Sequence, residues 1–183
     1  MQHKGTVNLE TERLILRKYT LSDAEDMFNN WASSEQVTKY LTWQAYKSVN
    51  DVQKYIKYVI SMYDDNHYDW VIELKENHLA IGSIGIVNLQ EDIEEVTVGY
   101  CLSEKYWHKG IMSEALSALI KFFFVEVKAN RISSYHDVQN PNSGGVMKKC
   151  GMKYEGTHRQ ADKNNTGICD KCVYAILKDD YLQ

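Results

Sequence analysis

The residues best placed to do chemistry lie where a predicted strand runs into a predicted helix. The strand at residues 94–102 leads into a loop that contains Gly110, and the apolar residues after it recur at three- and four-residue steps. The first turn of a helix offers unpaired backbone N–H groups and the positive end of the helix dipole, which suit a phosphate. Gly110 has no Cβ to keep a phosphate away from the backbone. A plain turn between a strand and a helix would show the same residues. Whether this loop binds a phosphate is therefore judged from motifs elsewhere in the chain.

The elements around this segment alternate between strands and helices. Alternating apolar residues predict strands at residues 12–18, 68–75, 79–89, 94–102, 131–138, 152–159 and 172–178. Helices are predicted after Ser22 (with Glu25 in the capping box), after Ser48, from Gly110, and from Asn140-Pro141 to Gly151. Interleaved strands and helices, with several neighbouring strands in hairpins, predict a mixed-sheet α/β protein.

The length, net charge and cysteine content of the chain indicate which classes of protein are expected. The 183 residues contain no Gly/Ser-rich linker, so we expect one domain over residues 1–183. The net charge of −4 disfavours a nucleic-acid-binding role. No apolar run approaches the ~20 residues of a membrane span, and residues 1–10 lack the apolar core of a secretory signal. Four cysteines in such a chain are typical of free thiols, so we expect a cytoplasmic protein with no membrane and no nucleic-acid partner.

Short motifs follow one another in a fixed order through the second half of the chain. They are Gly99-Tyr100, Trp107-His-Lys-Gly110, Glu114-Ala115, Arg131-Ile132, Asn140-Pro-Asn-Ser143, Lys149-Cys-Gly151 and Glu155-Gly156. This series resembles the GNAT superfamily of N-acetyltransferases, specifically the branch that acetylates ribosomal-protein N-termini (Rim-type). The resemblance covers about residues 9–181.

The resemblance implies both a fold and a co-substrate. The fold would be α/β (α+β), with a mixed, mostly antiparallel sheet of about seven strands, splayed in the middle and flanked by about four helices. Acetyl-CoA would enter between two parallel strands, with its pyrophosphate on the glycine loop and its pantetheine arm added to the strand at 98–102. No metal is implied. The expected acetyl-CoA contacts are Tyr100, Cys101, Leu102, Trp107, His108, Lys109, Gly110, Ile111, Met112, Ser113, Asn140 and Ser143.

The chain departs from the family pattern at positions that affect the predicted chemistry. Trp107 and Met112 replace the usual Gln or Arg and Gly or Ala of the loop, where phosphate contacts are mostly to backbone. Many relatives carry a Tyr seven residues after the Asn, which protonates the leaving thiolate; here that residue is Met147. The Rim-type resemblance suggests Ser143 as the substitute, although a Ser near a helix start also suits a cap.

An acceptor ammonium must lose a proton before its nitrogen attacks a thioester, so a base or a water chain to a carboxylate is required. Rim-type relatives often have Glu where this chain has Thr97, so the first candidate is Glu95, on the same face of that strand. Glu95 also fits a solvated carboxylate in an acidic run. His136, Asp137 and Glu155 are the alternatives.

For the acceptor, we expect Trp43 and His136 to contact the substrate. Trp43 belongs to an aromatic set that lines either a pocket or the core: Tyr40, Trp43, Tyr46 and Trp70.

The spacing Cys169-Asp-Lys-Cys172 is half of a zinc knuckle. Cys101 and Cys150 do not form a second such pair, so we expect no metal. Neither has an evident paired base, which disfavours an acetyl-cysteine intermediate.

Three functions follow, in order of preference. The first is acetylation of a protein N-terminal amine, with a ribosomal protein as the partner. The second is acetylation of a small amine, such as a polyamine, an amino acid or an aminoglycoside. The third is a non-catalytic sensor that binds coenzyme A. The sequence is compatible with a monomer or a homodimer.

Overall fold

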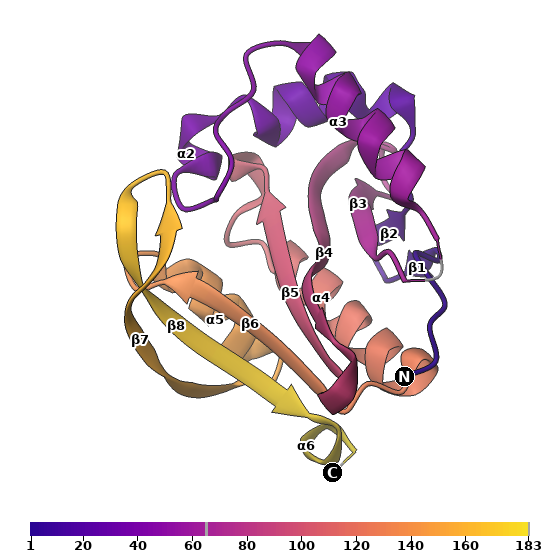
Figure 1. Ribbon diagram of the computed structural model, residues 1–183. Coiled ribbons are helices and arrows are strands. Elements are labelled where there is room, and N and C mark those ends of the chain that lie inside the picture. Colours follow the sequence, from indigo (N-terminus) through magenta and orange to yellow (C-terminus); the bar gives the residue numbers. More distant parts are fainter. Residues whose placement is uncertain (65, 183) are drawn as a thin grey trace.

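The centre of the molecule is one eight-stranded sheet (Figure 1), in a computed structural model that describes residues 1–64 and 66–182. The strands lie in the order β1-β2-β3-β4-β5-β6-β8-β7, and only β5 and β6 run parallel. Their bounds are β1 Leu9–Glu10, β2 Leu14–Arg17, β3 Asp69–Leu74, β4 Ala80–Gln90, β5 Glu95–Leu102, β6 Arg131–Asp137, β7 Lys153–Asn164 and β8 Gly167–Leu177.

Helices cover both faces of this sheet. The α-helices are α1 Ala24–Met27, α2 Glu35–Thr38, α3 Val49–Met62, α4 Ile111–Phe122, α5 Pro141–Lys149 and α6 Lys178–Tyr181. Short 3₁₀ turns are η1 Leu21–Asp23, η3 Glu91–Ile93 and η4 Glu104–Tyr106, and π-helical turns are η2 Phe28–Ala32 and η5 Phe123–Val127.

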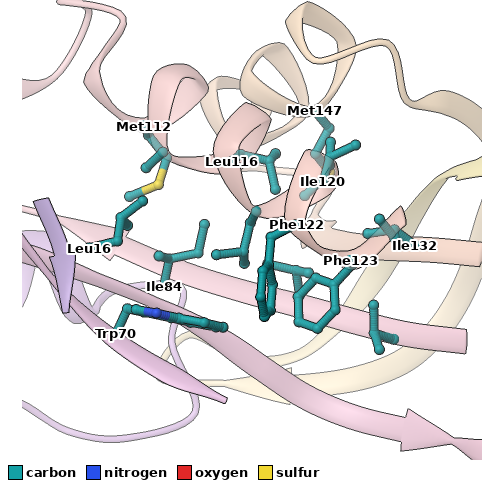
Figure 2. Close-up of a cluster of buried hydrophobic side chains, with 14 of the residues drawn as sticks. Leu16, Trp70, Ile84, Met112, Leu116, Ile120, Phe122, Phe123, Ile132 and Met147 are labelled. Atoms are coloured by element: carbon teal, nitrogen blue, oxygen red, sulfur yellow. The ribbon is translucent and has the colours of Figure 1, made fainter. Parts of the chain in front are cut away.

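Two hydrophobic clusters hold the helices on opposite faces of the sheet. Because successive residues of a strand point to opposite faces, Trp70 and Ile72 join one cluster and Val71 joins the other. The larger cluster packs α4 on the sheet, with Leu116, Ile120 and the two rings of Phe122 and Phe123 over Trp70 and Ile84 (Figure 2). The smaller cluster packs α1, η2 and α3.

The sheet splits between its two parallel strands. β5 and β6 pair only at Glu95–Thr97 with Arg131–Ser133, and the ribbons then diverge (Figure 1). Buried hydroxyls complete the paired end: Thr97 Oγ1 lies 3.0 Å from Ser133 Oγ. The Ser134 hydroxyl donates to the Val98 carbonyl at 2.8 Å, where the ladder stops. The opening therefore begins just after Thr97.

A single side chain bridges the top of this opening. Asn165, in the turn between β7 and β8, donates from its side-chain amide to the carbonyls of Thr38 and Trp43, at 2.9 and 2.8 Å. Its backbone N–H donates to the Leu41 carbonyl at 3.2 Å. These bonds connect the segment between α2 and α3, at the top of Figure 1, to the β7–β8 hairpin across the opening.

The structure confirms the splayed, mostly antiparallel sheet and corrects its details. There are eight strands instead of about seven, because β1 is a two-residue pairing of Leu9 with Leu16 that is too short to show alternation. Six α-helices replace the expected four or so, since short turns of helix line the segment before α3. Ser48 caps α3 as predicted, but Ser22 does not begin the first helical segment. Thr20 does, and its N–H donates to Asp23 Oδ2 at 2.7 Å.

Among the described residues, none of the helices combines the length and apolar character that crossing a bilayer would require.

Candidate active site

Two cavities meet at the open end of the splayed sheet. The first, which we call the helix cavity, has a volume of about 420 Å³ and lies at the start of α4 and along α5. The second, the strand cavity, has a volume of about 330 Å³ and lies over β3 to β6 and the β7–β8 hairpin. Six residues line both: Tyr40, Leu41, Tyr100, Cys101, Asn140 and Ser143. A molecule in one cavity can therefore react with a molecule in the other only near these residues.

The helix cavity contains nearly all of the residues predicted to contact acetyl-CoA. Every one of them lines it except Lys109. The Lys109 ammonium instead lies 5.4 Å from the centre of the Tyr106 ring, and its carbonyl accepts a hydrogen bond from Arg13 at 3.1 Å. The sequence motifs therefore converge in space on one cavity.

The loop before α4 is shaped for an anion. His108 and Gly110 both have left-handed backbone angles, with φ of 59° and 75°, which turn the chain into the first turn of α4. A Cβ on Gly110 would lie 3.6 Å from both Arg13 Nη2 and Lys149 Nζ. Two cationic groups and the N-terminus of a twelve-residue helix thus surround a position without a side chain, as a phosphate site requires.

Sequence reasoning gave Arg13 and Lys149 no role, because each is far from the loop along the chain. Arg13 is held in place by Glu114, whose carboxylate accepts from Arg13 Nε at 2.7 Å. Glu114 lies in the first turn of α4, so its pairing with Arg13 also ties β2 to the start of that helix. Lys149 lies in the last turn of α5 and keeps an exposed ammonium.

The outer part of β5 presents an open edge to the helix cavity. Tyr100 to Leu102 pair with β4 on one side, while the ladder with β6 ends at Thr97. Trp107 covers the end of this strand, where its indole N–H donates to the Leu102 carbonyl at 2.8 Å. An extended amide chain can add to such an edge through backbone hydrogen bonds. This is the geometry that a pantetheine arm needs.

Ser143 and Tyr100 form a hydroxyl pair where the two cavities meet. The Ser143 hydroxyl donates to the Tyr100 hydroxyl at 3.0 Å, and the Tyr100 hydroxyl donates to the Ser143 carbonyl at 3.0 Å. Burial raises the pKa of Tyr100 well above its usual value, so this phenol stays protonated at neutral pH. Met147, the residue at the position of the usual family Tyr, is fully buried in the core. Of the residues weighed for protonating a thiolate, Ser143 alone has a hydroxyl in the cavity.

The two cavities differ in charge. The helix cavity is lined by Lys149 and His108 and by no carboxylate among the described residues. The strand cavity is lined by the carboxylates of Asp69, Asp137 and Asp162 and, within residues 1–64 and 66–182, by neither lysine nor arginine. Opposite charges on the two sides suit an anionic ligand in the first cavity and a cationic one in the second.

Asp69 is a site residue that sequence reasoning missed. It is the first residue of β3 and lies in the strand cavity, partly exposed. Its Oδ2 accepts a long hydrogen bond, 3.4 Å, from the Tyr55 hydroxyl. Enclosure by the protein raises the pKa of Asp69 to about 7, because burial disfavours the charged carboxylate. A polar residue directly before the apolar run of residues 70–72 was the only signal in the sequence.

Two of the carboxylates proposed from the sequence are not in either cavity. Glu95 is buried at the paired end of β5, where its Oε1 accepts from Ser133 at 2.5 Å and from Arg131 Nε at 3.0 Å. Glu155 pairs with the same Arg131 guanidinium through both of its oxygens. The Arg131 guanidinium lowers the pKa of Glu155 below its usual value, as expected for a carboxylate in an ion pair. The structure therefore gives both a place in an ion-pair network.

His136 and Asp137 do line the strand cavity, at the end of β6. The His136 ring stacks on Tyr174, and its Nδ1 lies 2.7 Å from the Asp137 carbonyl. The other ring nitrogen, Nε2, is buried without a hydrogen-bond partner in the described structure. Asp137 accepts from the Gln139 N–H at 2.8 Å and from the Asn164 amide at 2.7 Å. Both of its oxygens are therefore occupied in holding the loop after β6.

The aromatic set divides between the cavity and the core. Tyr40 and Trp43 line the strand cavity, and Tyr46 packs behind them, 5.7 Å from the Trp43 ring and 6.2 Å from that of Tyr55. For Trp70 the structure selects the core alternative. Trp70 is fully buried, and its indole N–H donates to the Val7 carbonyl at 2.7 Å.

The cysteines are all free, and no group of three or more His, Cys, Asp or Glu side chains within the described ranges is arranged to hold a metal ion. Cys101 lies where the cavities meet and its Sγ is 3.2 Å from Ser83 Oγ. Burial raises the pKa of Cys101 to about 11, so the thiol is protonated at neutral pH and is a poor nucleophile.

Known proteins with similar sequences indicate the family to which this chain belongs. The family described as "Acetyltransferase (GNAT) domain" matches residues 13–153. The chain is 30% identical, over 93% of its length and 96% of the relative's, to the uncharacterized N-acetyltransferase YoaA of Bacillus subtilis (strain 168). It is 29% identical, over 76% of its length and 78% of the relative's, to the ribosomal-protein-serine acetyltransferase of Escherichia coli (strain K12).

A solved structure has the same fold as this chain. The GNAT-family acetyltransferase from Bacillus anthracis superimposes with a TM-score of 0.83 at 25% identity, covering 94% of this chain and 99% of that one. The family match spans most of the chain. The structure has both the splayed sheet and the glycine loop that the family resemblance implies. The chain belongs to the GNAT family and is an acetyl-CoA-dependent N-acetyltransferase.

Proposed function

We propose that this enzyme acetylates the α-amine of a protein N-terminus, with a ribosomal protein as the natural acceptor. The observation that carries the proposal is the meeting of two oppositely charged cavities at Ser143 and Tyr100. The acidic strand cavity suits an ammonium group, and the cationic helix cavity suits the phosphates of acetyl-CoA. The name of the Escherichia coli relative, a ribosomal-protein-serine acetyltransferase, supports a protein acceptor.

The helix cavity has groups for each part of acetyl-CoA. The backbone N–H groups at Gly110 to Met112, with Arg13 and Lys149, would hold the phosphates. The open edge of β5 and Asn140 would hold the pantetheine arm. Acetyl-CoA supplies the thioester. A backbone N–H between Tyr100 and Leu102, which line this cavity, would stabilise the developing oxyanion as a preorganised donor.

Ser143 has the role of a proton donor toward the leaving thiolate. Its hydroxyl lines both cavities and is linked to the buried, protonated phenol of Tyr100. Such a pair can pass a proton to the thiolate without becoming charged for long. Ser143 lies in the first turn of α5, and that helix fixes where its hydroxyl points.

Replacing Ser143 tests this role. In Ser143→Ala we expect kcat to fall about 10²-fold, the lower end of what a positioned acid contributes, with acetyl-CoA affinity unchanged. Steady-state kinetics and calorimetric titration measure the two quantities. Ser61→Ala, on the exposed surface of α3, is the matched control and should change neither. Equal kcat in Ser143→Ala and the wild type would remove Ser143 from the chemistry.

A small cationic amine is the second candidate, and the three carboxylates of the strand cavity are the observation that favours it. The deciding experiment incubates the enzyme with acetyl-CoA and a panel of ribosomal-protein N-terminal peptides, polyamines, amino acids and aminoglycosides. Mass spectrometry reads the products, because four free thiols would interfere with thiol reagents. Acetylated peptides alone support the proposal. Acetylation of small amines alone overturns it in favour of the second candidate, and binding without any product favours a sensor.

A further inference from the structure

Of the carboxylates weighed as the general base, Glu95 and Glu155 lie in the Arg131 network outside both cavities, and Asp137 accepts hydrogen bonds at both oxygens. We infer that Asp69 binds the acceptor's ammonium group in the strand cavity and accepts its proton before acetyl transfer. The inference rests on the proposed function only in requiring an amine acceptor, whether peptide or small molecule.

The space beside the Asp69 carboxylate is kept open by glycines. In the sheet Asp69 lies opposite Gly85, and Gly85 lies opposite Gly99 on β5. A Cβ on Gly85 would lie 3.1 Å from Asp69 Oδ1 and 2.7 Å from the Tyr68 carbonyl oxygen, closer than real Cβ atoms come to backbone. All three residues of this row line the strand cavity. The row from β3 to β5 therefore leaves Asp69 accessible from the cavity.

Asp69 lacks a cationic partner in the part of the chain that the structure describes. The groups that face it are neutral acids and hydroxyls: Tyr55 from α3, Tyr19 from the segment before η1, and Cys101 from β5. Tyr63, the residue after α3, donates to the Asp69 backbone carbonyl at 3.0 Å. Lys18 lies over the Tyr63 ring, 4.9 Å from its centre.

Another polar group in this cluster also lacks a partner. The Tyr19 hydroxyl is buried without a hydrogen bond to any described residue, although buried hydroxyls are normally bonded. Burial is the main cause that raises the pKa of Tyr19, and the charge of Asp69 raises it further. An ammonium group has three N–H donors. It would give the Asp69 carboxylate the charged partner that it lacks among the described residues.

The acid strength of Asp69 suits the proton that it has to accept. Its pKa of about 7 is raised by burial and lowered only by the Tyr55 hydrogen bond. An α-ammonium has a pKa near ~8 and a lysine-type ammonium near ~10.4. Transfer to Asp69 is therefore uphill by about one pKa unit for an α-amine, but by about three for a side-chain amine. Asp69 thus favours an α-amine as the acceptor.

The steps balance without any further reactant. The acceptor R–NH₃⁺ gives one proton to the Asp69 carboxylate and becomes R–NH₂. The nitrogen lone pair then attacks the thioester carbonyl carbon, the C–N bond forms and the C–S bond breaks. The second proton lost by nitrogen goes to the departing thiolate, through Ser143. The proton on Asp69 then leaves to solvent, and the carboxylate is restored.

The test compares Asp69→Asn with the wild type on whichever amine the panel identifies. We expect kcat/KM to fall 10²- to 10⁴-fold, while acetyl-CoA affinity and the circular dichroism spectrum are unchanged. Because the acceptor binds as the ammonium, kcat/KM should fall above the amine pKa of about 8. In the wild type it should also rise with pH in a step near pH 7, since only the carboxylate accepts a proton. In Asp69→Asn that step should vanish. Asp92→Asn, in the exposed η3 turn, is the matched control and should keep both rate and profile.

The outcomes separate this inference from the proposed function. Loss of rate and of the pH step in Asp69→Asn supports the inference, whether the acetylated amine is a peptide or a small molecule. A variant with wild-type rate and profile overturns it, even if peptides are acetylated. As a readout that does not need turnover, the Asp69 carboxyl ¹³C signal should titrate near pH 7 and shift on addition of a peptide with a free N-terminus. A midpoint near pH 4, or no shift with peptide, also overturns it.

Discussion

The helix cavity and the strand cavity are built on different plans. The helix cavity takes most of its lining from two short stretches, the loop and first turn of α4 and the start of α5, and its ligand groups are largely backbone. The strand cavity draws its lining from β3, β4, β5, β6, the segment before α3 and the β7–β8 hairpin, and its ligand groups are side chains. A cavity of the first kind can hold the same ligand in many sequences, while one of the second kind can change its ligand by a few substitutions.

The largest expected effect is a loss of acetyl-CoA affinity, caused by a substitution that disturbs the helix cavity alone. In Gly110→Val, a β-branched residue would have to adopt a φ near 75°, which such residues avoid, so the loop must rearrange. We expect the Kd for acetyl-CoA to rise about 100-fold, equivalent to about 2.7 kcal/mol. Calorimetric titration measures it. If Gly167→Val, at another positive φ but outside both cavities, weakens binding as much, the conformation of Gly110 is not the reason.

A smaller effect tests the strand cavity through folding stability. The folded protein binds a proton on Asp69 more tightly than the unfolded chain does, since the pKa is about 7 against a usual 3.8. The stability that this proton contributes is complete below about pH 4 and is lost as pH rises to about 7. Asp69→Asn, which stays neutral, should therefore be more stable than the wild type at pH 8.5, by about 2 kcal/mol.

This difference should raise Tm by about 4–8 °C at pH 8.5 and by much less at pH 4.5. Thermal unfolding followed by circular dichroism measures it. Asp92→Asn, an exposed carboxamide substitution, provides the baseline at both pH values. An equal Tm for the wild type and Asp69→Asn at pH 8.5 would mean that the carboxylate is not held in an unfavourable environment.

The smallest expected effect tests whether the cationic charge of the helix cavity contributes to acetyl-CoA affinity. Lys149→Gln removes one of the two cations beside Gly110, and we expect Kd for acetyl-CoA to rise three- to tenfold at low salt, about 1 kcal/mol. The effect should shrink as ionic strength increases, because Lys149 is exposed. Lys148→Gln, one residue earlier and over the Tyr174 ring, should leave affinity unchanged. A similar loss in both variants would point to net charge, with no specific contact.

The helix cavity and the strand cavity also differ in how well their residues could be predicted from the sequence. Gly110, Asn140 and Ser143 were found because each lies in a contiguous motif at the start of a helix, where local spacing fixes the geometry. Asp69 was missed because its surroundings come from four separate segments. Glu95 was placed by its strand face, but a face does not say where along the strand a sheet opens.

The position along β5 explains the difference. The parallel ladder with β6 ends at Thr97, so Glu95 lies in the closed part of the sheet and Tyr100 in the open part. Only the pairing of strands distant in sequence fixes that boundary. Arg13 and Lys149 were likewise unassigned, because their approach to Gly110 depends on how β2 and α5 pack around α4.

The bridge made by Asn165 has a consequence for the shape of molecules that can enter. It joins the carbonyls of Thr38 and Trp43 to the β7–β8 turn, and residues on both sides of this bridge, Trp43 and Asn164, line the strand cavity. We expect this bridge to hinder the middle of a polypeptide lying flat across the sheet and to leave access for a free end or a single long side chain. The proposed acceptor would then be selected by where its chain terminates more than by the residues that it contains.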